Sequence, residues 1–139
     1  MIEKEFEYKG YNCIITFDAL GIRCGYVALT PKHKHFETPY WEIPVSCHGG
    51  LTWGEHHIPD RMEDKSIYYI GFDCGHCFDK PDFNLALKCF PASAKFIKGR
   101  QEFYSKLRRN FKGTIKDQEY VEQELKCLVD QLRKRRNKK

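Results

Sequence analysis

Aspartate and histidine residues that could carry out acid–base chemistry or bind a metal lie in one short segment of this sequence, directly after its most strand-like run. Asp73, His76 and Asp79 are spaced three residues apart, and Gly75 permits a tight turn between them. An imidazole oriented by a carboxylate can act as a general base, so His76 with Asp73 is a candidate catalytic pair. The structural alternative is that Asp73 caps the turn and His76 is a hydrogen-bonded residue of the fold.

His48 is a further candidate, because it precedes a Gly-Gly pair and could approach this segment from a neighbouring strand. We predict a functional pocket with His48, Asp73 and His76 as its catalytic residues. Two imidazoles and two carboxylates also suit a divalent metal such as zinc or manganese, with His48, Asp73, His76 and Asp79 as the ligands. A metal held in this way could activate water for hydrolysis.

The glycine pair offers a second kind of chemistry. Successive N–H groups around Gly49 and Gly50 can form a nest for an anion, and Thr52 adds a hydroxyl donor. The alternative is a glycine bulge that bends a strand. The residues predicted to bind a small phosphorylated or nucleotide-like ligand are His48, Gly49, Gly50, Thr52 and Trp53.

Cysteine usage places the chain in a reducing compartment. Seven cysteines, an odd number, and a charged N-terminus that does not resemble a signal peptide argue for free thiols in a cytosol. Cys74 and Cys77 form a C-x-x-C pair, but no second pair at short spacing completes a zinc site. We therefore expect most of these thiols to be buried apolar residues.

Periodicity predicts the elements that must position these residues. Alternation over residues 2–8 and 11–17 predicts a β-hairpin, and residues 23–29 and 66–73 are also strand-like, the latter as a central strand. Helical spacing is found from about residue 93 to 110 and from about 116 to 135. Strands followed by helices indicate an α+β fold, in which two C-terminal helices pack on one face of a mostly antiparallel sheet.

The charge is distributed unevenly along the chain, which we predict to be one domain over residues 1–139. Residues 1–94 carry 9 Lys or Arg against 13 Asp or Glu, a net charge of −4, whereas residues 95–139 carry 15 against 6, a net charge of +9. We divide the chain into a strand-rich body (1–92), a helical part (93–135) and a basic tail (133–139).

The basic third is the alternative working surface. Residues 95–112 and 133–139 have the charge expected of a nucleic-acid-binding or host-protein-binding region. The aromatic residues of the first helix lie at core spacing, so we expect them to be buried rather than stacked on bases. No stretch approaches the roughly 18 apolar residues of a membrane span, and we expect no membrane association.

An ordered set of short motifs resembles a family of small, largely uncharacterised bacteriophage and prophage proteins. The matching segments are Cys24-Gly25-Tyr26-Val27, His48-Gly49-Gly50-Leu51-Thr52, Ile70-Gly71-Phe72-Asp73-Cys74-Gly75-His76 with Asp79, and Glu119-Tyr120-Val121. The resemblance implies a phage accessory protein in a bacterial cytoplasm, with His48, Gly49, Gly50, Asp73, His76 and Asp79 at the matching positions. It implies no established reaction, and the His-rich insert at 55–57 and Cys77 depart from the family pattern.

The favoured hypothesis is a small phage-type protein that counteracts a host defence or host factor. Its His/Asp/Gly pocket would bind the phosphorylated or nucleotide-like ligand, and we favour non-catalytic binding slightly over metal-assisted hydrolysis. Two alternatives stay open. One is an inhibitor that binds nucleic acid or a host protein through the basic third, and the other is a metal-dependent hydrolase that uses His48, Asp73 and His76.

Overall fold

A five-stranded antiparallel sheet forms the centre of the molecule in the computed structural model, which describes residues 1–76, 78–107 and 113–137, the last four of these by their backbone alone. The strand order is β1-β2-β3-β5-β4, and each neighbouring pair is antiparallel. The strands are β1 (Ile2–Tyr8), β2 (Tyr11–Phe17), β3 (Arg23–Leu29), β4 (Trp53–Glu55) and β5 (Tyr68–Asp73).

The N-terminal hairpin is confirmed, and its turn explains its register. Lys9 and Gly10 adopt φ angles of 49° and 85°, which are the two left-handed conformations of a tight hairpin turn. Tyr8 therefore pairs with Tyr11 at the end of the ladder. The third strand is also confirmed, and β5 lies between β3 and β4 with both faces covered, as a central strand should.

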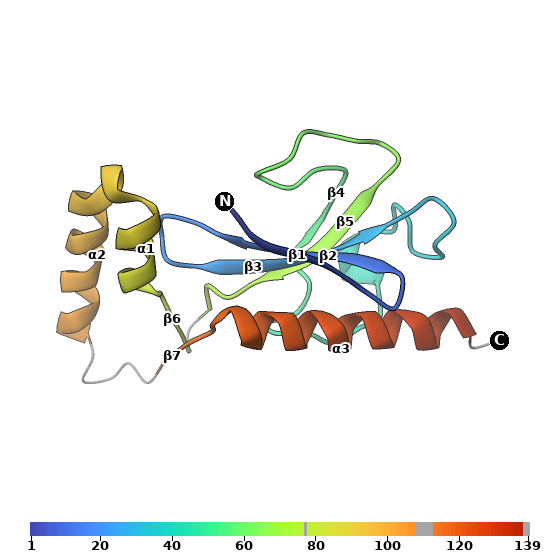
Figure 1. The fold of residues 1–139 in the computed structure, drawn as a ribbon. Helices are drawn as coiled ribbons and strands as arrows, with labels where there is room; N and C mark the ends of the chain where they lie inside the picture. The colour runs from blue at the N-terminus through green and yellow to red at the C-terminus, as the bar shows by residue number, and fades with distance from the viewer. Residues whose placement is uncertain (77, 108–112, 138–139) are drawn as a thin grey trace.

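Helices and short strands complete the fold, which is α+β as predicted (Figure 1). α3 lies along one face of the sheet, whereas α1 and α2 form a separate helical pair at one end of the molecule (Figure 1). The remaining elements are η1 (Tyr40–Glu42), β6 (Asp79–Lys80), α1 (Phe83–Cys89), η2 (Pro91–Ser93), α2 (Ala94–Leu107), β7 (Thr114–Ile115) and α3 (Gln118–Asn137).

The main core lies between α3 and the sheet. The apolar stripe that the sequence predicts on the last helix is fully buried there. Its members, all 0% exposed, are Val121, Leu125, Leu128, Val129 and Leu132. Burial of each such side chain is worth roughly 1.5–3 kcal/mol, so this face of α3 holds the helix and the segments at its start against the sheet.

The first predicted helix differs from expectation in its packing. α2 packs on α1 rather than on the sheet, and only Ile97 among its residues is buried. Phe96, Phe103 and Leu107 are 53%, 60% and 47% exposed, so the expectation that these side chains fill the core is wrong. Their periodicity reflects one apolar stripe, but α1 is a helix of only seven residues and covers only part of it.

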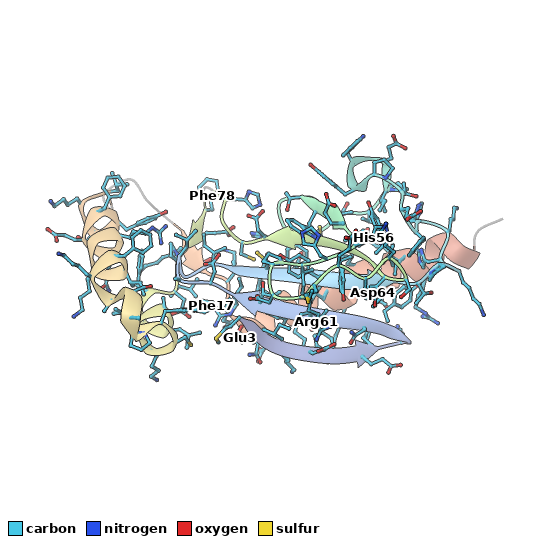
Figure 2. All side chains as sticks on the ribbon, turned by 90° about the horizontal axis from the view of Figure 1, so that it is seen from above. Glu3, Phe17, His56, Arg61, Asp64 and Phe78 are labelled. Carbon is cyan, nitrogen blue, oxygen red and sulfur yellow. The ribbon has the colours of Figure 1, made fainter. Side chains whose placement is uncertain are left out.

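A buried arginine joins the parts of the fold that flank the functional site. The Arg23 guanidinium, 5% exposed, donates to both carboxylate oxygens of Glu3 at 2.8 and 3.0 Å and to Asp82 at 3.3 Å. It also stacks on Phe17 and donates to the backbone carbonyl of Lys116. Glu3 and Phe17 lie at the end of the sheet that faces α1 (Figure 2). This ion-pair network fixes α1 and the segment before α3 to the sheet.

Candidate functional site

His48 lies in a tight turn that depends on the glycines after it. Gly49 and Gly50 adopt φ angles of 69° and 81°, and the Gly50 N–H closes the turn by donating to the Cys47 carbonyl at 2.9 Å. Left-handed conformations of this kind favour glycine. The His48 N–H donates to the Glu124 carboxylate at 2.8 Å, which ties the turn to α3.

Both ring nitrogens of His48 have partners, and these come from distant parts of the chain. Nε2 lies 2.8 Å from Oδ2 of Asp79, and Nδ1 lies 2.7 Å from the hydroxyl of Tyr120. Asp79 begins β6, whereas Tyr120 is in the first turn of α3, where its backbone N–H donates to the capping side chain of Asp117. The imidazole is therefore held between a carboxylate and a phenol.

Asp79 is the most deeply buried member of this group, with its side chain 2% exposed. Burial by itself raises the pKa of this carboxyl, but hydrogen bonds from His48, the His76 backbone and Lys116 outweigh that effect and lower the pKa below its usual value. The Lys116 ammonium lies 3.2 Å from Oδ1. Parallel pairing of Asp79 with Thr114 brings this lysine into reach.

The partners assign the tautomer of His48. An ionised Asp79 can only accept, so Nε2 of the imidazole carries a proton and donates it. In the neutral ring Nδ1 is then an acceptor, and the Tyr120 hydroxyl donates to it. Burial and the nearby Glu124 carboxylate raise the pKa of Tyr120, so the phenol retains its proton at neutral pH. Tyr120, His48 and Asp79 thus form a chain along which a proton can move.

A more exposed layer covers this chain. Nε2 of His76 lies 3.4 Å from Oδ1 of Asp73, and the two side chains are 38% and 36% exposed. Asp73 also accepts from the Thr52 hydroxyl at 3.1 Å and from the Gly75 N–H at 3.0 Å. The His76 ring sits 5.8 Å from that of His48, centre to centre, and is seated directly on Gly49. A side chain at Gly49 would occupy the position of this ring.

The four predicted metal ligands come together, but as two adjacent pairs. His48 bonds Asp79, and His76 faces Asp73. Among the described residues, from which Cys77 is missing, no group of three or more His, Cys, Asp or Glu side chains is arranged to hold a metal ion. The hydrogen bonds already made by His48 and Asp79 explain this, because they occupy the atoms that would bind the metal. These residues therefore give the metal-centre hypothesis no support.

The predicted amide nest is largely used inside the protein. The His48 N–H binds Glu124, the Gly50 N–H binds Cys47, and the Thr52 N–H donates to the Gly71 carbonyl at 2.9 Å. The turn therefore already holds an anion, the carboxylate of Glu124. An external phosphate would have to displace these contacts, so the turn does not supply the open phosphate cradle that we expected.

Trp53 does not belong to the site. It packs edge-on against Tyr26, 6.1 Å between ring centres, in the apolar cluster on the sheet face opposite α3. Its indole N–H donates to the His57 carbonyl at 2.9 Å. Period-2 alternation explains the error, since Trp53 and Thr52 are neighbours and point to opposite faces of a strand. Trp53 anchors the loop after β4.

Three residues of the site were not predicted as functional: Lys116, Tyr120 and Glu124. All belong to α3 or to the segment before it, and they lie more than thirty positions away in sequence from the histidine and aspartate motifs. Tyr120 does stand within the motif of residues 119–121 that resembles the phage family. That motif was the one available signal, whereas an isolated lysine or glutamate gives none.

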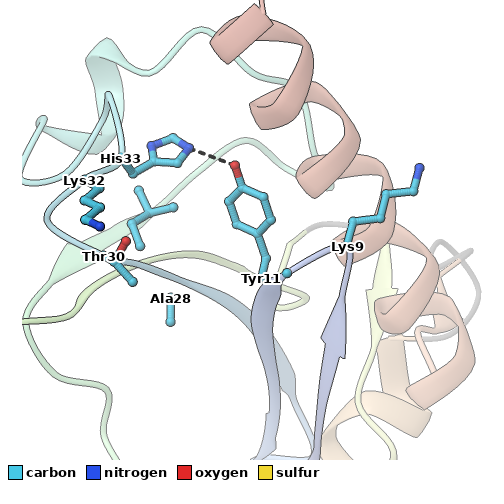
Figure 3. A pocket seen from close by; sticks show the side chains of 8 residues that line it. Lys9, Tyr11, Ala28, Thr30, Lys32 and His33 are labelled. Carbon is cyan, nitrogen blue, oxygen red and sulfur yellow. Dashed lines mark hydrogen bonds between the residues drawn. The ribbon is translucent and has the colours of Figure 1, made fainter.

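A separate pocket of about 150 Å³ lies at the β1–β2 turn (Figure 3). Tyr11 and His33 form part of its wall and are joined by a 3.1 Å hydrogen bond between hydroxyl and Nε2 (Figure 3). None of the predicted site residues lines it. Lys9, which also lines it, directs its ammonium to Asp130 at 2.9 Å.

Comparisons with known proteins give this arrangement no precedent. No protein-family model matches the chain, and neither the curated proteins nor the solved structures contain a match. In the part of the chain that the structure describes, no helix combines the length and apolar character needed to cross a membrane.

Proposed function

We propose that this chain is a phage-type accessory protein that binds a small nucleotide-like ligand at the His48 site and transfers a proton there. The observation that carries the proposal is the placement of His48, with its two ring nitrogens 2.8 Å from buried Asp79 and 2.7 Å from the Tyr120 hydroxyl. A base oriented by a carboxylate and bonded to a hydroxyl is the arrangement used for acid–base chemistry.

Each group has a role in this scheme. Asp79 holds His48 in the Nε2–H tautomer and stabilises the imidazolium that forms when Nδ1 takes a proton. The Tyr120 hydroxyl gives its proton to Nδ1 and takes a proton from the ligand. The reverse transfer returns both protons to their starting groups. Lys116 keeps Asp79 ionised by its 3.2 Å contact with the carboxylate.

The charges around the site favour recognition of hydroxyl or amino groups over phosphate. Asp73, Asp79 and Glu124 are acceptors, and Lys116 is the cationic neighbour of Asp79. The partly exposed Asp73 carboxylate can accept from a ribose hydroxyl or an exocyclic amine, and the exposed His76 ring can stack on a base. A phosphate group would have to bind through the imidazoles of the site.

The biological setting rests on the motifs that resemble phage proteins. A protein of this kind, expressed in the cytoplasm of a bacterial host, would counteract a host defence or host factor by sequestering or altering its ligand. The site thus supports the ligand class, and the sequence motifs support the biological setting.

Binding and turnover of adenosine, guanosine and their 5′-monophosphates test the proposal, by calorimetry for affinity and by chromatography for product. We expect His48→Gln to weaken binding by about tenfold or more, since it breaks the hydrogen bonds that hold Tyr120 and Asp79 in the site. Tyr120→Phe should retain binding and lose any turnover. His57→Gln is the matched control, because its backbone carbonyl still accepts from Trp53. The proposal fails if none of the four compounds binds, or if His48→Gln binds as the wild type does.

A further inference from the structure

The outer side of α2 carries an apolar stripe that no described part of the chain covers. Phe96, Phe103 and Leu107 are 53%, 60% and 47% exposed. At 100° per residue these three side chains fall within one narrow sector of the helix, next to the sector of Ile97 and Tyr104 that faces α1. Exposed apolar side chains gathered in this way mark interaction surfaces.

The position of α2 leaves this stripe accessible from outside the fold. In two views at right angles, α2 lies beyond α1 at one end of the molecule, away from the sheet and from α3 (Figures 1 and 2). The stripe lies at the side of α2, about a quarter turn from the sector that faces α1. Gly99, in the middle of the helix, is exposed and has no other atom within 4 Å of the place where a side chain would begin.

The charge beside the stripe is strongly positive. α2 carries Lys95, Lys98, Arg100 and Lys106 against a single acid, Glu102. At 100° per residue, Lys95 and Lys106 lie on one side of the stripe and Arg100 lies on the other, whereas Lys98 lies on the opposite side of the helix. Glu102 forms only an exposed 3.7 Å pair with Lys106, so cations outnumber acids beside the stripe. An occupant of this surface must therefore be acidic as well as apolar.

The spacing of the rings favours a helical peptide over a nucleic acid. Phe96 and Phe103 are seven residues apart, so they lie about 10 Å apart along the helix axis. Stacked bases follow one another at about 3.4 Å per strand, which is far shorter. Apolar residues repeated every seven positions instead match the contact seam of two packed helices.

We infer that the outer face of α2, formed by Phe96, Phe103 and Leu107 with the lysines beside them, docks an acidic amphipathic helix of a partner protein. The partner's apolar side chains pack between the two phenylalanine rings, and its carboxylates pair with Lys95 and Lys106. This surface does not involve the His48 site, so an experiment that refutes one proposal leaves the other unaffected.

A displayed library of helical peptides tests this inference with the full-length protein as the target. One library holds apolar residues on one face and Asp or Glu on the other, and the matched library holds Lys or Arg in place of the acids. We expect selected binders from the acidic library alone, and about a tenfold or greater loss of their affinity with Phe96→Ser or Phe103→Ser. A charge-reversed Lys95→Glu/Lys106→Glu variant should also weaken binding, and added salt should weaken binding to the wild type.

Trp41→Ser is the matched control, because Trp41 is 71% exposed but lies in η1, outside the helical pair. Circular dichroism confirms that each variant is folded. The inference is overturned if the acidic library yields no binder, if binders persist unchanged on the Phe96 and Phe103 variants, or if a single-stranded oligonucleotide displaces them and binds the stripe more tightly.

Discussion

His48 and Asp79 are 31 residues apart in the chain, yet Nε2 of the imidazole lies 2.8 Å from Oδ2 of the carboxylate. Two turns bring them together. The His48 turn ends in two left-handed glycines, and the Asp79 turn is closed by an N–H of Asp79 that donates to the His76 carbonyl while Asp79 accepts from the His76 N–H. The pair is the centre of the site.

Gly49 and Gly50 provide a matched test of how the turn seats His76. Both adopt positive φ, so an alanine at either position should cost about 1–2 kcal/mol in the free energy of unfolding. At Gly49 the added carbon would also lie 2.2 Å from Nε2 of His76, whereas at Gly50 it would meet nothing within 4 Å. Gly49→Ala should therefore destabilise the protein more and shift the His76 ring signals in an NMR spectrum. Equal effects of the two variants would contradict the placement of His76.

The lowered pKa of Asp79 predicts a pH-dependent contribution to stability. Its folded-state pKa lies below the usual 3.8, so ionised Asp79 stabilises the fold at pH values above that figure and loses this effect as the pH falls through the folded-state pKa. The difference in free energy of unfolding between wild type and Asp79→Asn should be largest near neutrality and shrink below about pH 4. Urea unfolding at a series of pH values measures it. Glu63→Gln, at an exposed position, should give a small difference throughout.

Arg23 and Arg61 contrast a buried with an exposed ion pair. Arg23→Ala leaves Glu3 and Asp82 without their buried partner and should cost about 3–5 kcal/mol in the free energy of unfolding. Arg61→Ala removes a pair with Glu5 in which the side chains are 33% and 36% exposed, and it should cost less than about 1 kcal/mol. Chemical denaturation compares them. A loss at Arg23 no greater than at Arg61 would show that the buried network contributes little.

Two further glycines test packing in opposite directions. A methyl group at Gly25 would lie 2.8 Å from the Phe72 ring and 3.1 Å from Leu125, so Gly25→Ala should cost about 1–3 kcal/mol by overfilling the core under α3. Gly99→Ala should instead stabilise α2 by about 0.5–1 kcal/mol, because the site is open and alanine favours the helix. Thermal unfolding monitored by circular dichroism would show the opposite signs. A stabilising Gly25→Ala would contradict the close approach of β3 and α3.

Burial predicts the order in which the thiols react. It raises the pKa of Cys13 and of Cys47 to about 12, so at neutral pH neither holds a reactive thiolate in the folded protein. Among the described thiols Cys127 is the exposed one, on α3, and it should be alkylated before Cys13 and Cys47. Timed treatment with iodoacetamide, followed by peptide mass mapping, gives the order. Modification of Cys47 as fast as Cys127 would show that the His48 turn opens readily.

Local periodicity was sufficient to predict the four long strands and the two long helices, but not the short helix α1. Alternation predicted the hairpin of β1 and β2, and the stripe from Val121 to Leu132 predicted the buried face of α3, because each pattern records which face of an element is apolar. The sequence also indicated that His48, Asp73, His76 and Asp79 would lie in one region, since glycine-dependent turns stand beside each motif.

Only the tertiary structure decided what those residues bind and what the helical third presents. His48 finds Tyr120 and Asp79 through packing of α3 and pairing of β6, and Glu124 takes the place of an external anion at the turn. Such contacts join segments far apart in the chain, where local patterns carry no information. In the same way, periodicity shows that Phe96 and Phe103 lie on one apolar face of a helix. Whether that face is buried depends on the length of the helix that packs against it. Because α1 is short, part of the α2 stripe stays exposed, and a predicted core became a surface.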